Sequence, residues 1–221
     1  PNQPSSQRAV AIDMPQAGQA AVVVAVPLPP PGPERAVAVV TNAVLGGGFS
    51  SRLNQEIRIR RGLSYGADSG LDLRPGGGSL RAVVQTKNES AAEVVRLVQA
   101  ELDRLATDAV EPTELDARKA TLIGEVSRSV ETTAGLAGSV ASLVVDGRPL
   151  SELRTRIDAL NAVDSGAVLR YAAQHFDAAG RHVVVAGQTT RFAEALRSAA
   201  ADLVIIPAGR LDLDGAGPAT P

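Results

Sequence analysis

The segment from Gln19 to Val26 is an apolar run rich in valine, which predicts a buried β-strand. Because every residue after Gln19 is apolar, we expect this strand to lie in the centre of a sheet with both faces covered. A second run with apolar, β-branched residues spans Arg8 to Ile12. The intervening residues, Met14 to Gly18, include a proline and a glycine, which predicts that the two runs pair as a hairpin.

The other segments alternate between strand and helix signals. The apolar residues of 34–45 have helical spacing, although their valines also permit a strand. Ser90 followed by Glu93 is a capping-box pattern and predicts the start of a helix. Further strands are predicted at Leu63–Leu73, Ser79–Thr86, His182–Ala186 and Leu203–Ile206, and helices at 34–45, 51–61, 90–105, 112–130, 132–145, 151–160, 164–176 and 190–198. This order predicts an α+β fold with two layers, in which helices cover one face of a mixed, largely antiparallel sheet.

The composition excludes several classes of protein. The chain has a net charge of -2 and is only 2% aromatic, so it lacks the basic surface and the stacking platform of a nucleic-acid binder. It has no cysteine, which excludes disulfides and thiolate metal sites. No apolar run reaches the length of a membrane span, and the composition leaves bacterial cytoplasm and periplasm both open. With 44% apolar residues and so few aromatics, the core is expected to be aliphatic.

The domain organisation follows from the two ends of the chain. Residues 1–7 read as a linker, and the sequence has no initiator methionine, so we expect a piece of a longer polypeptide. Residues 8–206 are expected to form a single α/β domain. The Gly-, Pro- and Asp-rich residues 207–221 are expected to be a disordered tail.

Metal and nucleotide sites find little support in the sequence. A catalytic zinc ion needs about three protein ligands, whereas His175 and His182 are the only histidines and no H-x-x-E-H pattern occurs. Gly46 to Gly48 precede a predicted helix, as in a phosphate-binding loop. However, the Lys-Ser or Lys-Thr of a nucleotide-binding loop does not follow them.

A serine hydrolase is a separate alternative. Gly62-Leu63-Ser64-Tyr65-Gly66 matches the G-x-S-x-G pattern that surrounds a nucleophilic serine. The later residues Asp146 and His182 would complete the order of a Ser-Asp-His triad. In those enzymes a strand precedes the serine and a helix follows it, whereas the reverse order is predicted here, which argues against the alternative.

Arg58 and Tyr65 are the remaining candidates for chemistry. An arginine is permanently charged and presents several N–H donors, and a tyrosine hydroxyl donates one more hydrogen bond. Arg58 lies near the end of a predicted helix, and Tyr65 follows the Gly62-Leu63-Ser64 turn. The two side chains could converge on one carbonyl oxygen and stabilise the negative charge that develops there.

The residues around this pair resemble the second, metal-free half of the pitrilysin/insulinase-type zinc peptidases, the inverzincins. This family includes the mitochondrial processing peptidase and the core proteins of respiratory complex III. The resemblance spans roughly residues 8–206 and rests on several motifs that occur in order. These are Leu45-Gly46-Gly47-Gly48, Ser51-Arg52-Leu53, Glu56-Ile57-Arg58 and Arg61-Gly62-Leu63-Ser64-Tyr65.

The resemblance implies a substrate-binding domain that is inert alone. It implies that Arg58 and Tyr65 bind the substrate backbone near the scissile carbonyl and stabilise the tetrahedral intermediate. Gly46, Gly47, Gly48 and Phe49 are implied to handle an extended peptide that adds to a sheet edge. Zinc is expected in a homologous partner domain or subunit that closes a chamber with this one. The alternative within the family is a structural or assembly domain without chemistry.

Overall fold

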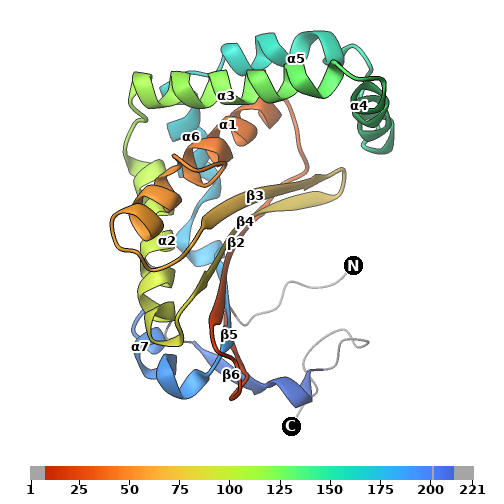
Figure 1. The fold of residues 1–221 in the computed structure, drawn as a ribbon. Helices are drawn as coiled ribbons and strands as arrows, with labels where there is room; N and C mark the ends of the chain where they lie inside the picture. The colour runs from red at the N-terminus through yellow and green to blue at the C-terminus, as the bar shows by residue number, and fades with distance from the viewer. Residues whose placement is uncertain (1–7, 201, 212–221) are drawn as a thin grey trace.

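A six-stranded sheet organises the chain, with helices packed against one of its faces (Figure 1). The structure, a computed structural model, describes residues 8–200 and 202–211. The strands are β1 (Ala9–Asp13), β2 (Ala20–Leu28), β3 (Ala67–Arg74), β4 (Gly77–Thr86), β5 (His182–Gly187) and β6 (Val204–Pro207), in the spatial order β3-β4-β2-β5-β1-β6. Strands β3, β4, β2 and β5 pair antiparallel, whereas β1 runs parallel to both β5 and β6. The predicted fold class is confirmed.

The predicted hairpin of β1 and β2 is wrong. Strand β5 lies between them, so Val185 is opposite Val22 on one side and Ala11 on the other. The turn that follows β1 binds β5 as well, because the Met14 N–H donates to the Gly187 carbonyl at 2.8 Å. The valines of β5 can pair on both sides, and this long-range pairing replaces the local one.

Strand β2 is central, as predicted, but only one of its faces is fully buried. Its residues alternate along the strand between buried positions, such as Val22 and Val24, and partly exposed ones, such as Ala21 and Val23. Strands β4 and β5 show the same alternation. The prediction that both faces of this strand are covered is therefore wrong, because the helices of the described chain lie on a single face of the sheet (Figure 1).

The predicted helices are all present, and 34–45 is helical rather than extended. Packed against β2, α2 is the main core helix and buries residues such as Val94, Val98 and Leu102. The longer helices are α1 (Arg35–Leu45), α2 (Ala91–Thr107), α3 (Pro112–Val130), α4 (Thr133–Val145), α5 (Glu152–Asn161), α6 (Ser165–His175) and α7 (Ala193–Arg197). Short 3-10 turns are η2 (Asn88–Ser90), η3 (Ala178–Gly180), η4 (Thr189–Arg191) and η5 (Ala208–Arg210).

Helix ends agree with the sequence in two places and differ in a third. The Asp164 side chain accepts a hydrogen bond from the Ala167 N–H at 2.6 Å and caps α6, where the sequence predicts that a helix begins. Gly147 follows α4 with a φ of 66°, a conformation that favours glycine. The predicted capping box at Ser90 is wrong, because Ser90 already has helical dihedral angles and its side chain caps nothing. The 3-10 turn η2 runs directly into α2 and takes the place of the cap.

The core is largely aliphatic, as predicted, with Phe176 and Phe192 as its largest fully buried side chains. Within the described ranges, no helix is both long and apolar enough to cross a bilayer. The predicted linker at 1–7 lies outside the described residues, as does most of the predicted tail, 212–221.

Candidate functional site

The glycine run ends α1 and packs closely against two neighbouring segments. The Ser69 N–H on β3 donates to the Gly46 carbonyl at 3.1 Å. A Cβ atom on Gly46 would lie 2.4 Å from the Ser69 nitrogen, and one on Gly47 would lie 2.6 Å from the Ala43 Cα. Both glycines are therefore required for close packing. Gly46 is buried, whereas Gly47 and the following Phe49 are exposed.

A buried asparagine holds the end of this loop. The Gly48 carbonyl accepts a hydrogen bond from the Asn54 side-chain amide at 3.1 Å. The same amide group accepts one from the Ala67 N–H at 3.2 Å, where β3 begins. Asn54 is only 3% exposed and so fixes the loop to the first residue of β3. Sequence reasoning missed it, although a polar residue beside the buried Leu53 was a signal.

The segment that carries Arg58 is a helix, as predicted, but it has π geometry. In η1 (Asn54–Ile59), the Arg60 N–H donates to the carbonyl of Gln55, five residues earlier. Single π turns of this kind often occur at functional sites. The wider turn changes which side chains share a face, and a helix prediction based on a 3.6-residue period does not anticipate it.

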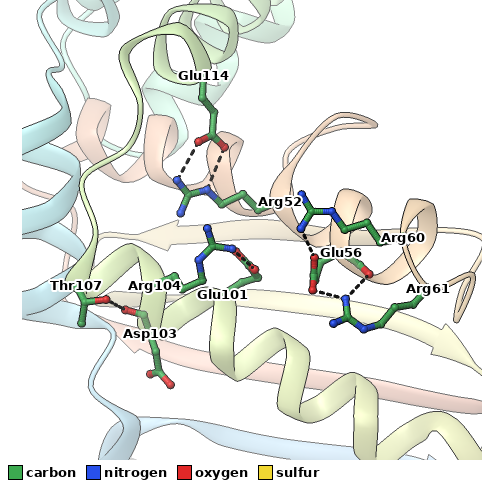
Figure 2. A network of polar contacts seen from close by, with 9 residues as sticks. All are labelled: Arg52, Glu56, Arg60, Arg61, Glu101, Asp103, Arg104, Thr107 and Glu114. Atoms are coloured by element: carbon green, nitrogen blue, oxygen red, sulfur yellow. Dashed lines mark hydrogen bonds and ion pairs between the residues drawn. The ribbon is translucent and has the colours of Figure 1, made fainter.

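Ion pairs fix this segment to the helical layer (Figure 2). Arg52 donates two hydrogen bonds to Glu114 of α3, at 3.0 and 2.9 Å. Burial opposes the charge of Arg52, but the hydrogen bonds and charge of Glu114 outweigh it and raise the pKa of Arg52. Glu56 accepts hydrogen bonds from Arg60, at 2.8 Å, and from Arg61. Burial acts to raise the pKa of Glu56, but these two arginines lower it overall.

Arg58 differs from its arginine neighbours. Arg52, Arg60 and Arg61 each pair with a carboxylate, whereas Arg58 has no ion pair or hydrogen bond from its side chain in the described part of the chain. Its guanidinium carbon instead lies 4.7 Å from the centroid of the Phe49 ring. This is a cation–π contact, which leaves the N–H donors at the edge of the guanidinium free. The structure thus brings together Arg58 and Phe49.

Tyr65 lies in the loop between η1 and β3, and it is 91% exposed. Gly62 turns the chain into this loop with a φ of 63°. The Ser64 hydroxyl oxygen lies 2.6 Å from the carbonyl oxygens of both Gly66 and Gln85. These contacts shorten the predicted strand, which begins at Ala67 instead of Leu63.

The same contacts weaken the serine hydrolase alternative. They engage the Ser64 hydroxyl with backbone carbonyls, and no hydrogen bond joins it to either histidine in the described residues. The local order is also the reverse of a nucleophile elbow, because η1 precedes Ser64 and β3 follows it.

Tyr65 borders an open depression of about 440 Å³. The depression lies beside β3 and β4, and it is also lined by Gln19, Asp68, Val83 and Gln85. Val83 and Gln85 belong to the set of β4 residues that alternate with the buried ones, so the depression adjoins the sheet face without helices. Arg58 does not line it, and no hydrogen bond joins Arg58 to Tyr65.

The residues that the structure describes do not fit a zinc ion. Among the described residues, no group of three or more His, Asp or Glu side chains is placed to hold a metal. The His175 ring packs at a tilt against Tyr171, with 4.6 Å between ring centroids, and its Nε2 lies 3.9 Å from a Glu34 carboxylate oxygen. His182 is on β5, opposite Ala25 of β2.

Comparisons with known proteins agree with this geometry. Residues 1–122 match the family model of the peptidase M16 inactive domain. An uncharacterized zinc protease of Mycobacterium tuberculosis is 37% identical over 92 residues, which are 42% of this chain and 21% of that protein. The crystal structure of a peptidase M16 inactive domain from Pseudomonas fluorescens has a TM-score of 0.74 and 27% identity. A protease from Helicobacter pylori has the same fold, with a TM-score of 0.75 and 18% identity.

These relatives are longer than this chain. The alignment covers 81% of this chain but 44% of the Pseudomonas chain, and 82% against 45% for the Helicobacter protein. The family model covers more than half of the chain and includes the glycine run, Arg58 and Tyr65. The chain belongs to the peptidase M16 inactive domain family.

Proposed function

We propose that this chain is the substrate-binding, metal-free domain of a zinc endopeptidase that cleaves unfolded peptides. A homologous zinc-bearing domain or subunit would supply the metal and close a chamber with it. The observation that carries the proposal is the state of Arg58, whose guanidinium has no carboxylate partner while its three arginine neighbours do. An unpaired guanidinium beside an exposed loop is available to an external acceptor.

Arg58 and Tyr65 would act on the substrate backbone. Phe49 supports the Arg58 guanidinium from one face, so its N–H groups are held in a defined plane. The Tyr65 hydroxyl stands on an exposed side chain and can donate to the same carbonyl group. Donors placed where negative charge develops stabilise the transition state. The two side chains do not touch in the isolated chain, and such contacts often form only when substrate binds.

The glycine loop and the sheet edge would hold the peptide. Gly47 and Phe49 are exposed, Gly48 is half-buried, and Phe49 contacts Arg58, while Gly46 is buried against β3. Strand β3 is at the end of the sheet, and beyond Ser69, whose N–H already donates to Gly46, its outer side has no partner strand among the described residues. An extended peptide could add to this edge through main-chain hydrogen bonds.

The test uses this chain together with its zinc-bearing half and an unfolded peptide substrate. Arg58→Gln and Tyr65→Phe should each lower kcat by about 10²-fold, because each removes one donor to the developing oxyanion. The matched control is Arg60→Gln, since Arg60 is in the same segment but is paired with Glu56 at the surface. We expect this control to retain its turnover.

Two results would contradict the proposal in different ways. Unchanged turnover in both variants would remove Arg58 and Tyr65 from the chemistry. Absence of cleavage with every zinc-bearing partner would instead favour a structural role for the domain.

A further inference from the structure

Three arginines from separate segments meet in the helical layer, away from Arg58. Arg35 begins α1, Arg148 follows α4, and Arg156 lies on α5. All three line a cavity of about 530 Å³ and also an adjoining cavity of about 440 Å³. The helices that bound these cavities, α1, α3, α4 and α5, lie together at the top of Figure 1.

Asp146 and Glu152 also line the larger cavity, and the three arginines differ in how closely they pair with these carboxylates. Arg148 binds Glu152, with 3.3 Å between its Nε and Oε1, and lies 3.7 Å from Asp146. Arg35 has only one long contact, 3.4 Å from its Nη2 to Asp146. Arg156 has no ion pair within the described ranges. The wall of the larger cavity carries three positive and two negative side chains, so it has one positive charge in excess, whereas Glu125 lines the adjoining cavity.

Arg35 differs from Arg148 and Arg156 in having a buried donor atom without a partner among the described residues. Its Nη1 is shielded from solvent and has no hydrogen-bond partner among the described residues. Burial, followed by the positive charge of Arg148, lowers the pKa of Arg35. An unpaired donor on a buried charged group is destabilising, so a negative group in the cavity near Arg35 would be stabilising.

The rest of the cavity wall selects the kind of anion. Pro31, Val39, Leu73 and Leu160 provide apolar surface next to the arginines. A single excess charge matches a monoanion, and the apolar wall matches a hydrocarbon portion of the ligand. We propose that this cavity, lined by Arg35, Arg148 and Arg156, binds a carboxylate carried on an apolar chain. The proposal does not depend on the role of Arg58 and Tyr65 in proteolysis.

Calorimetric titration of the chain with octanoate at low salt tests the proposal, and octanamide is the uncharged probe of the same shape. Octanoate should bind saturably, more weakly at high salt, and octanamide should not. Arg156→Gln should weaken octanoate binding by about two- to fivefold, the expected loss for one exposed ion pair at low salt. Arg154→Gln is the matched control, because Arg154 is exposed on the same helix and lines neither cavity.

A second comparison identifies the source of the carboxylate. A short apolar peptide is titrated with its C-terminus either free or amidated. Preference for the free peptide would identify a chain terminus as the ligand, and binding of octanoate alone would identify a fatty acid. Equal binding of octanoate and octanamide, absence of saturable binding by any carboxylate, or equal effects of the two arginine variants would overturn the proposal. Arg156 is exposed, so its substitution should leave the fold intact, as a thermal melt would verify.

Discussion

At the scale of single residues, glycine has two roles in the loop after α1. Any glycine can supply backbone freedom, whereas the structure gives Gly46 a role in packing. Its carbonyl binds the Ser69 N–H, and no side chain fits between the two segments. Gly48 is different, because its φ of 146° is a conformation that other residues rarely adopt. Periodicity and composition cannot separate these roles, since the contact with Ser69 joins residues that are distant in sequence.

Gly46→Ala should therefore destabilise the fold by about 1–3 kcal/mol, the usual cost of overpacking a closely packed site. The added methyl group would meet the backbone of Ser69, which cannot move without shifting β3. Urea unfolding would measure the loss. Gly18→Ala is the control, because a Cβ atom there meets nothing within 4 Å. Equal stability of the two variants would show that the contact is not required.

At the scale of elements, the sequence predicts the positions of the helices well, but it does not predict the side-chain contacts between segments. Apolar periodicity located α2 and α3, since one face of α2 is buried and the partly buried Leu122, Ile123 and Val126 of α3 pack against the core. It did not reveal the π geometry of η1 or the pairing of Arg52 with Glu114, which are 62 residues apart. The motif predicted Arg58 and Tyr65 as candidates, but not that Phe49 would stack on Arg58. The Arg52–Glu114 and Phe49–Arg58 contacts join residues that no local sequence pattern relates, and the π geometry departs from the regular helical period.

The Glu56 network should make the stability of η1 depend on pH. Because Arg61 and Arg60 lower the folded-state pKa of Glu56 below its usual 4.5, the carboxylate stabilises the fold above that pH. This contribution should be lost as the pH falls through the lowered folded-state value. Glu56→Gln should cost about 1 kcal/mol at pH 7, and the difference from the unsubstituted chain should shrink in acid.

Urea unfolding at a series of pH values would test this expectation. Glu194→Gln is the control variant, because Glu194 is exposed and has no ion pair in the described part of the chain. A Glu56→Gln difference that stays constant down to strongly acidic pH would contradict the assignment.

At the scale of the whole molecule, the sheet and the core helices form one firmly packed unit, and α4 lies at its margin (Figure 1). Helix α2 buries eight residues, whereas α4 buries only Leu143, although it contains no charged side chain. Its apolar residues Val144 and Val145 are exposed. The fold class followed from the order of segments, but the strand order did not, because β5 enters the sheet between two strands that are close in sequence.

Hydrogen exchange should show this difference in packing. Amides in α4 should exchange at least about tenfold faster than those in α2, after correction for intrinsic rates, because few buried contacts oppose local opening. Mass spectrometry of the isolated chain would measure both helices in one experiment. Equal protection of α4 and α2 would show that the exposed helix is held as firmly as the core.

The position of β1 has a consequence for the order in which the chain can fold during synthesis. Within the described ranges, β1 pairs only with β5 and β6, which begin at His182 and Val204. A ribosome adds about 5–20 residues per second, so it needs roughly 10–40 s to synthesise the intervening chain. Once β4 has been synthesised, the β3–β4 hairpin can pair with β2, whereas neither β5 nor β6 is yet available to pair with β1. The nascent domain therefore exposes the edge of β2 that β5 will occupy, and this edge is where a chaperone would be needed.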